Sequence, residues 1–158
     1  MRPLLDSDRD AFIAVANDPL IWEEHPEPDR ATAEKVDRFF ADAIGSGGAV
    51  VVTDADGKII GSSRFEEPDE AGDRILIDHT FLARPYWNLE DYLEVKTLLF
   101  DHAFTAFGTI ELQVGVHNAR TRHAVEDFLG AAYVETVLTP LGDHALYELS
   151  RSAWAERA

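Results

Sequence analysis

The sequence ILIDHTFLARPYWNLEDYLEVKTLLFDHAFTAF, residues 75–107, decides the fold, because in it a helix directly follows a central strand. The strand is predicted to end at about Ala83, and the helix is predicted from Leu89 to Phe107. Apolar side chains at helical spacing are predicted to face the core: Val95, Leu98, Leu99, Ala103 and Phe104. Asn88 stands three residues before Asp91 and is the predicted cap, so the helix should begin one or two residues after it.

Outward from this stretch, turn residues and apolar periodicity predict both helices and strands. Toward the N-terminus they indicate a short helix ending at Asn17-Asp18-Pro19, a loop at residues 21–30, a helix from about Ala31 that glycines end at 45–48, a hairpin of strands 49–52 and 59–61, an acidic loop at 66–73 and a strand at 74–83. Toward the C-terminus they indicate a strand at 110–116, a helix at 119–128 and a hairpin of strands 133–138 and 144–149. This order predicts an α+β fold with a mixed, mostly antiparallel sheet flanked by helices, in one domain over residues 1–158.

The balance of charge restricts the partners of the protein. Fourteen basic against 30 acidic residues leave a net charge of −16, which opposes binding to nucleic acid and to anionic membranes. No apolar run approaches the ~20 residues that span a bilayer. Residues 1–3 lead into an acidic segment and not into the core of a signal peptide, so a cytoplasmic location is expected.

Several common chemistries lack their sequence motifs. The six histidines have none of the spacings of a metal site and cysteine is absent, so we expect no metal. Neither the serine-hydrolase elbow nor a nucleotide-binding glycine motif is present. The glycines at 45–48 follow a helix, which predicts helix termination and not a phosphate loop. The place left for an anionic ligand is the helix start after Asn88.

The chain resembles the GNAT superfamily of N-acetyltransferases, and in particular its ribosomal-protein alanine acetyltransferase branch. The matching segments are Asn17-Asp18-Pro19, residues 59–65 (IIGSSRF), residues 80–87 (TFLARPYW), Lys96, residues 101–104 (DHAF) and residues 118–121 (NART). Together they extend over nearly the whole chain in the order of the family. The resemblance implies that the fourth and fifth strands splay apart and hold the pantetheine arm of acetyl-CoA.

The same resemblance implies a set of cofactor-binding residues. They are Phe81, Leu82, Trp87, Asn88, Leu89, Glu90, Asp91, Tyr92, Asn118, Arg120 and Thr121. The turn at 87–92 departs from the family motif Gln/Arg-x-x-Gly-x-Gly/Ala, since Glu90 and Tyr92 replace both glycines. Carboxylates in the first turn of the helix repel a pyrophosphate, so this turn is either a weakened phosphate site or a self-capped helix start. Asn118 is likewise either a cofactor contact or a helix cap, and Arg120 either a phosphate ligand or an ordinary surface residue.

The catalytic candidates also follow from the resemblance and from chemistry. A general base must take a proton from the acceptor ammonium, and Asp78, His79 and Glu111 are the candidates, each with a structural role as the alternative. Asp78 and His79 are neighbours on one strand, so at most one should face the cleft. The backbone N–H of Leu82 lies at the family position that polarises the thioester carbonyl and is the principal catalytic assignment. Val125 replaces the tyrosine that the family often uses as general acid.

Two functions remain open at this point. The first is an acetyl-CoA-dependent N-acetyltransferase in which an amine, either a small molecule or a peptide N-terminus, attacks the thioester directly. The second is a GNAT-fold protein that has lost acetyl transfer and serves as a binding or interaction module, for example as a homodimer. A rim of acidic residues predicts a cationic acceptor, the alternative being a solvated surface. These residues are Glu23, Glu24, Glu27, Asp29, Glu66, Glu67, Asp69, Glu70 and Asp73.

Overall fold

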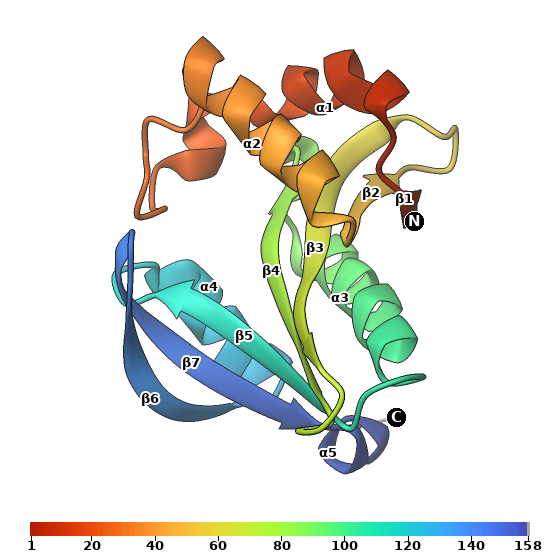
Figure 1. The fold of residues 1–158 in the computed structure, drawn as a ribbon, viewed down its shortest axis with the longest axis vertical. Coiled ribbons are helices and arrows are strands. Elements are labelled where there is room, and N and C mark those ends of the chain that lie inside the picture. Colours follow the sequence, from red (N-terminus) through yellow and green to blue (C-terminus); the bar gives the residue numbers. More distant parts are fainter. Residues whose placement is uncertain (158) are drawn as a thin grey trace.

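A single mixed sheet organises the protein in a computed structural model, which describes residues 1–157 (Figure 1). Within these residues seven strands follow the order β1-β2-β3-β4-β5-β7-β6. The strands are Arg2–Pro3 (β1), Ala49–Thr53 (β2), Ile59–Asp69 (β3), Arg74–Leu82 (β4), Thr109–Gly115 (β5), Ala132–Thr139 (β6) and Gly142–Ser150 (β7). The α-helices are Arg9–Ala16 (α1), Ala33–Ser46 (α2), Leu89–Ala103 (α3), Ala119–His123 (α4) and Arg151–Ala155 (α5). Neighbouring strands are antiparallel except for β4 and β5, so the predicted α+β architecture is confirmed.

Alternation along the strands gives the sheet two hydrophobic faces. Phe81 packs into a cluster with α1 and α2, whereas the next residue, Leu82, packs into a larger cluster with α3. Successive strand side chains point to opposite faces, and the pairs Val51-Val52 and Ile59-Ile60 divide between the two clusters in the same way. The end of β4 is therefore buried on both faces and rigidly held.

The two central strands diverge. Parallel pairing joins Arg74, Ile75 and Leu76 to Thr109, Ile110 and Glu111 at one end. Beyond this point β4 runs toward α1 and α2 while β5 turns away with β7, so the strands form a V (Figure 1). The implied splay of the fourth and fifth strands is thus present, with the short β1 counted as the first strand.

The start of α3 agrees closely with the sequence prediction. The helix begins at Leu89, Asn88 is its N-cap, and the Asn88 side chain accepts a hydrogen bond of 2.9 Å from the backbone N–H of Asp91. The helix ends at Ala103, four residues before the predicted end at Phe107. The backbone turns over residues 104–107, and the Gly108 N–H then donates a hydrogen bond to the Asp73 carbonyl.

One predicted loop is wrong. Residues 66–69 belong to β3, because Glu66 and Asp69 pair with Leu76 and Arg74, and the turn itself occupies residues 70–73. High acidity suggested a loop, but the backbone pairing depends on register and not on side-chain charge. The helix predicted at 119–128 is also divided, since α4 is followed by a π-helical turn at Ala124–Phe128.

Candidate active site

A cavity of about 360 Å³ lies where β4 and β5 diverge. Three walls enclose it: the end of β4, the start of α3, and α4 with its following turn. A fourth side is formed by the loop after α1, including Trp22 and His25. Most of the cofactor positions expected from sequence line this cavity, namely Phe81, Leu82, Trp87, Asn88, Leu89, Tyr92, Asn118, Arg120 and Thr121. Glu90 and Asp91 are not among the lining residues that the structure describes.

Leu82 presents its backbone to the cavity. The N–H of the next residue, Ala83, donates to the carbonyl of Ile60 on β3 at 2.7 Å. Successive backbone groups of a strand point to opposite edges, so the N–H and carbonyl of Leu82 face the open side toward β5. The carbonyl accepts a hydrogen bond of 2.7 Å from the indole Nε1 of Trp87.

Trp87 and Arg120 connect the two walls of the V. The guanidinium carbon of Arg120, on α4, lies 4.2 Å from the centroid of the Trp87 ring. Such a contact between a cation and an aromatic face is attractive by about 0.5–1 kcal/mol at exposed sites. Arg120 therefore supplies positive charge at the mouth of the cavity, next to the start of α3.

The asparagines at both helix starts are structural caps. Asn88 donates from Nδ2 to Asp91 Oδ2 at 2.6 Å, in addition to accepting from the Asp91 backbone. Asn118 caps α4 by accepting from the Thr121 N–H at 3.1 Å. Both side chains also line the cavity, so capping fixes their position without removing them from the site.

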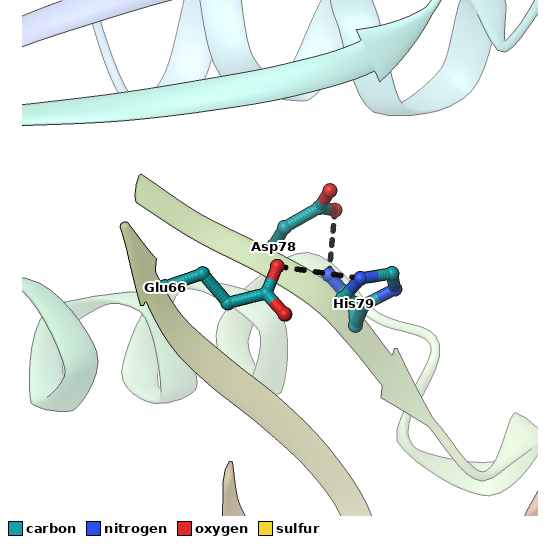
Figure 2. A group of neighbouring side chains, drawn as sticks. All are labelled: Glu66, Asp78 and His79. Atoms are coloured by element: carbon teal, nitrogen blue, oxygen red, sulfur yellow. Dashed lines mark hydrogen bonds and ion pairs between the residues drawn. The ribbon is translucent and has the colours of Figure 1, made fainter. Parts of the chain in front are cut away.

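A cluster of Glu66, Asp78 and His79 lies on β3 and β4 (Figure 2). The His79 Nε2 is 3.4 Å from Glu66 Oε2, and the His79 backbone N–H donates to Asp78 Oδ1 at 2.5 Å. Interaction with His79 is the main cause that lowers the pKa of Glu66. An anionic carboxylate beside an imidazole orients the ring.

Asp78 and His79 lie close together although they are neighbours on one strand, and a β-bulge is the reason. Neither is among the residues described as lining the cavity, so the prediction that at most one of them faces the cleft is not contradicted. Asp78 pairs with Arg64 and Phe81 pairs with Ser62, so two residues of β4 stand opposite Ser63 alone. His79 adopts a left-handed conformation with φ 55°. An inserted residue breaks the two-residue alternation, which brings the two side chains together.

The charge of this cluster is balanced within the protein. Glu66 accepts a hydrogen bond of 3.1 Å from buried Arg64. Burial lowers the pKa of Arg30, an effect that Glu27 and then the charge of Asp78 oppose. One imidazole and two carboxylates can ligate a metal ion, but the adjacent guanidinium groups weaken the attraction for a divalent cation.

Glu111 lies apart from the other catalytic candidates. It is on the paired segment of β5, where its carboxylate accepts from Arg74 Nη1 at 2.8 Å. Arg74 and Glu111 meet at the closed end of the V, whereas Leu82 lies at the open end. The structure therefore gives Glu111 an ion pair and places it away from the cavity.

Comparison with known proteins identifies the family. A family model described as an acetyltransferase (GNAT) domain matches residues 1–128. The chain belongs to the GNAT acetyltransferase family. A search of curated proteins gives no significant match.

Solved GNAT structures share the fold over nearly the whole chain. A GCN5-related N-acetyltransferase from Brucella melitensis has a TM-score of 0.81 at 20% identity, over 97% of this chain and 76% of that chain. Spermidine N-acetyltransferase from Vibrio cholerae, in complex with CoA and spermine, has a TM-score of 0.75 at 17% identity, over 98% and 96%. A GNAT-family acetyltransferase from Bacillus anthracis has a TM-score of 0.74 at 14% identity, over 96% and 93%. In residues 1–157 of this GNAT protein no helix is both long and apolar enough to cross a membrane.

A second cavity of about 550 Å³ adjoins the first and shares Glu24, His25 and Asn118 with it. Glu23 and Asp143 add further carboxylates to its lining. Burial, reinforced by the charge of Arg30, lowers the pKa of His25 to about 4. His25 is therefore neutral at physiological pH, and its Nδ1 accepts a hydrogen bond of 2.9 Å from the Glu27 N–H.

The acidic rim expected from sequence is only partly formed. Glu27 and Asp29 both pair with Lys35, and Glu27 also pairs with Arg30. The hairpin turn at 70–73 lies beside Gly108, at the closed end of the V, because the acidic segment is mostly strand. Within the residues described, Glu23, Glu24 and Asp143 are the carboxylates that line the second cavity.

Three residues of the site region were not singled out by the sequence reasoning for these roles. Thr80 lines the first cavity and, with His79, forms the bulge of β4. Glu66 is the partner of His79, and Lys96 is buried on the core face of α3. Lys96 did give a signal, since a lysine between Val95 and Leu99 interrupts the apolar stripe of that helix.

Proposed function

We propose that this GNAT protein transfers the acetyl group of acetyl-CoA to the nitrogen of an amine. The observation that carries the proposal is the cavity at the divergence of β4 and β5, which has the Leu82 backbone on one side and Arg120 on the other. An extended ligand with amide groups can pair with the open edge of β4, and Arg120 offers a charge for its phosphates.

The chemistry requires three actions from the chain. The Leu82 N–H donates toward the thioester oxygen, where negative charge develops during attack. His79, with Asp78 and Glu66 beside it, accepts the proton that the acceptor ammonium must lose, directly or through one water. The nitrogen then forms its bond to the acetyl carbon as the C–S bond breaks, and solvent supplies a proton to the departing thiolate because Val125 has no proton to give.

The test is a pair of measurements on the full chain. Acetyl-CoA should raise the melting temperature, because a ligand that binds only the folded state stabilises it. Incubation with acetyl-CoA and a panel of amines should then release free thiol. Absence of both effects would refute the proposal.

The capped start of α3 favours a second candidate, a binding module without acetyl transfer. Asn88 already satisfies a free N–H of the helix, and Glu90 and Asp91 place carboxylates in its first turn. This function predicts that no amine releases thiol from acetyl-CoA, whether or not acetyl-CoA stabilises the fold. The same two measurements therefore separate the candidates.

Replacement of Glu90 by glycine is expected to tighten acetyl-CoA binding by up to about tenfold. The change removes an exposed carboxylate near the positive end of the helix dipole, where phosphate is expected, and restores backbone freedom. Glu94→Gly, one turn further along the exposed side of α3, is the matched control and should leave the affinity unchanged. Identical calorimetric titrations for the wild type and Glu90→Gly would remove the repulsion argument.

The acceptor is expected to be cationic, with spermidine as the probe and peptide N-termini as the alternative class suggested by the alanine acetyltransferase resemblance. Glu24 lines both cavities, so Glu24→Gln should raise the KM for spermidine by about threefold at low salt. The difference in KM between Glu24→Gln and the wild type should vanish near 1 M salt, because charges more than ~3 Å apart are then largely screened from each other. Glu70→Gln makes the same change on the remote hairpin turn and should have no effect. Equal KM values for the two variants at low salt would contradict a role of the rim.

A further inference from the structure

A buried ammonium group lies beneath the bulge of β4. Lys96 is 5% exposed, and its Nζ donates a hydrogen bond of 2.9 Å to Thr80 Oγ1. The rings of Tyr92 and Phe100 flank Nζ at 5.8 and 5.9 Å. Burying a charge opposes folding, and an apolar side chain would fill the same space without that penalty. The core alone therefore gives no reason for a lysine at this position.

The contacts of Lys96 continue into a directed chain of hydrogen bonds. Thr80 Oγ1 lies 2.8 Å from Ser63 Oγ, and Ser63 Oγ lies 3.4 Å from the carbonyl oxygen of Asp78. An ammonium can only donate, so Thr80 accepts from Lys96 and its own hydroxyl hydrogen is free for Ser63. Ser63 then donates to Asp78. The chain thus holds the residues on both sides of His79.

The chain of hydrogen bonds from Lys96 through Thr80 and Ser63 to Asp78 holds a strained part of the backbone. His79 has φ 55°, a left-handed conformation that is strained for a residue other than glycine. If the bulge relaxed to regular pairing, Asp78 and His79 would return to opposite faces of β4. The proximity of Asp78 and His79 therefore depends on the bulge. The hydrogen bond from Lys96 to Thr80 connects the bulge to α3.

We propose that Lys96 is a positioning residue of the acetyl-transfer site, which holds the β4 bulge through Thr80 and Ser63 and so keeps Asp78 and His79 together next to Thr80, the first residue of β4 that lines the cavity. This role rests on the proposed function for its link to activity. Burial lowers the pKa of Lys96 to about 8, while the nearby charge of Asp78 opposes the shift. A neutral amine can accept as well as donate, so deprotonation removes the fixed direction of the chain.

The decisive variant is Lys96→Met, which keeps an unbranched side chain only one atom shorter and removes the charge. We expect a melting temperature equal to or above that of the wild type, because an apolar side chain replaces a buried ion. We expect kcat to fall about tenfold or more with the KM for acetyl-CoA within twofold, because misplacement affects the reacting groups and not the cofactor site. Lys58→Met makes the same change on an exposed turn and should match the wild type.

Ser63→Ala breaks the same chain on β3 and serves as the second variant, so the test does not depend on the folding of one protein. The double variant should lose no more activity than the more impaired single variant, since both changes disrupt one unit. The nuclear magnetic resonance signals of the His79 backbone amide should shift in both single variants and not in Lys58→Met.

Wild-type kcat in Lys96→Met, or unchanged His79 signals in both variants, would overturn the proposal. If the wild type itself acetylates no amine, the proposed function fails while the His79 signals still decide whether Lys96 holds the bulge.

Discussion

Replacement of His79 by asparagine is expected to lower kcat for amine acetylation by about 10²–10³-fold. The imidazole can take the proton of the acceptor ammonium, whereas an amide cannot. Asparagine is chosen because it tolerates the left-handed backbone of this position better than other residues, so the fold should persist. The melting temperature is expected to stay close to that of the wild type.

The control for this variant is His102→Asn, the same change at an exposed position in the last turn of α3. It should leave kcat unchanged. Glu66→Gln should give a smaller loss than His79→Asn, because Glu66 orients the ring and is not the proton acceptor itself. If His79→Asn retains more than a third of wild-type kcat, His79 is not the base and Asp78 becomes the candidate.

Replacement of Gly61 by alanine is expected to destabilise the protein by about 1–3 kcal/mol. A Cβ at this position of β3 would lie 2.3 Å from the carbonyl oxygen of Phe81 and 3.2 Å from the Cα of Leu82. Both are backbone atoms of β4 that cannot turn aside, so the two strands must separate where Leu82 faces the cavity. Urea denaturation should show the loss, and acetyl-CoA binding should weaken in parallel.

Gly45→Ala is the matched control, because a Cβ there meets nothing within 4 Å and the residue lies in α2. Alanine in a helix is more favourable than glycine by roughly 0.5–1 kcal/mol, so this variant should be more stable than the wild type. A Gly61→Ala protein with wild-type stability and affinity would show that the end of β4 is not held as tightly as its packing indicates.

Local patterns in the sequence were sufficient for most of the fold. The start of α3 was predictable because Asn88 satisfies a backbone donor in a way that depends only on nearby residues. The end of α2 was predictable for the same reason, since Gly47 takes the left-handed conformation that ends the helix. Charge was a poorer guide, because the acidic residues at 66–69 extend β3 by pairing with a strand that follows later in the chain.

The candidate site was less predictable because its geometry depends on register. No local signal marks the extra residue of β4 opposite Ser63, so the meeting of Asp78 and His79 could not be foreseen from their adjacency. Glu111 was placed among the catalytic candidates because it is on the fifth strand of the family pattern, but the parallel pairing brings it to Arg74 at the closed end. Both outcomes depend on how strands align, which the composition of a single strand does not specify.

The hydrogen bond between Trp87 and the Leu82 carbonyl means that a ligand entering the cavity must replace a contact within the protein. A ligand that pairs with this part of β4 competes with the indole N–H, and one whose phosphates bind Arg120 competes with the stacked ring. The measured affinity of such a ligand equals its intrinsic affinity multiplied by the fraction of molecules in which the groove is open, so a tenfold preference for the closed form weakens binding about tenfold. The concentration of ligand at which the protein becomes occupied is therefore set partly by its own side chains.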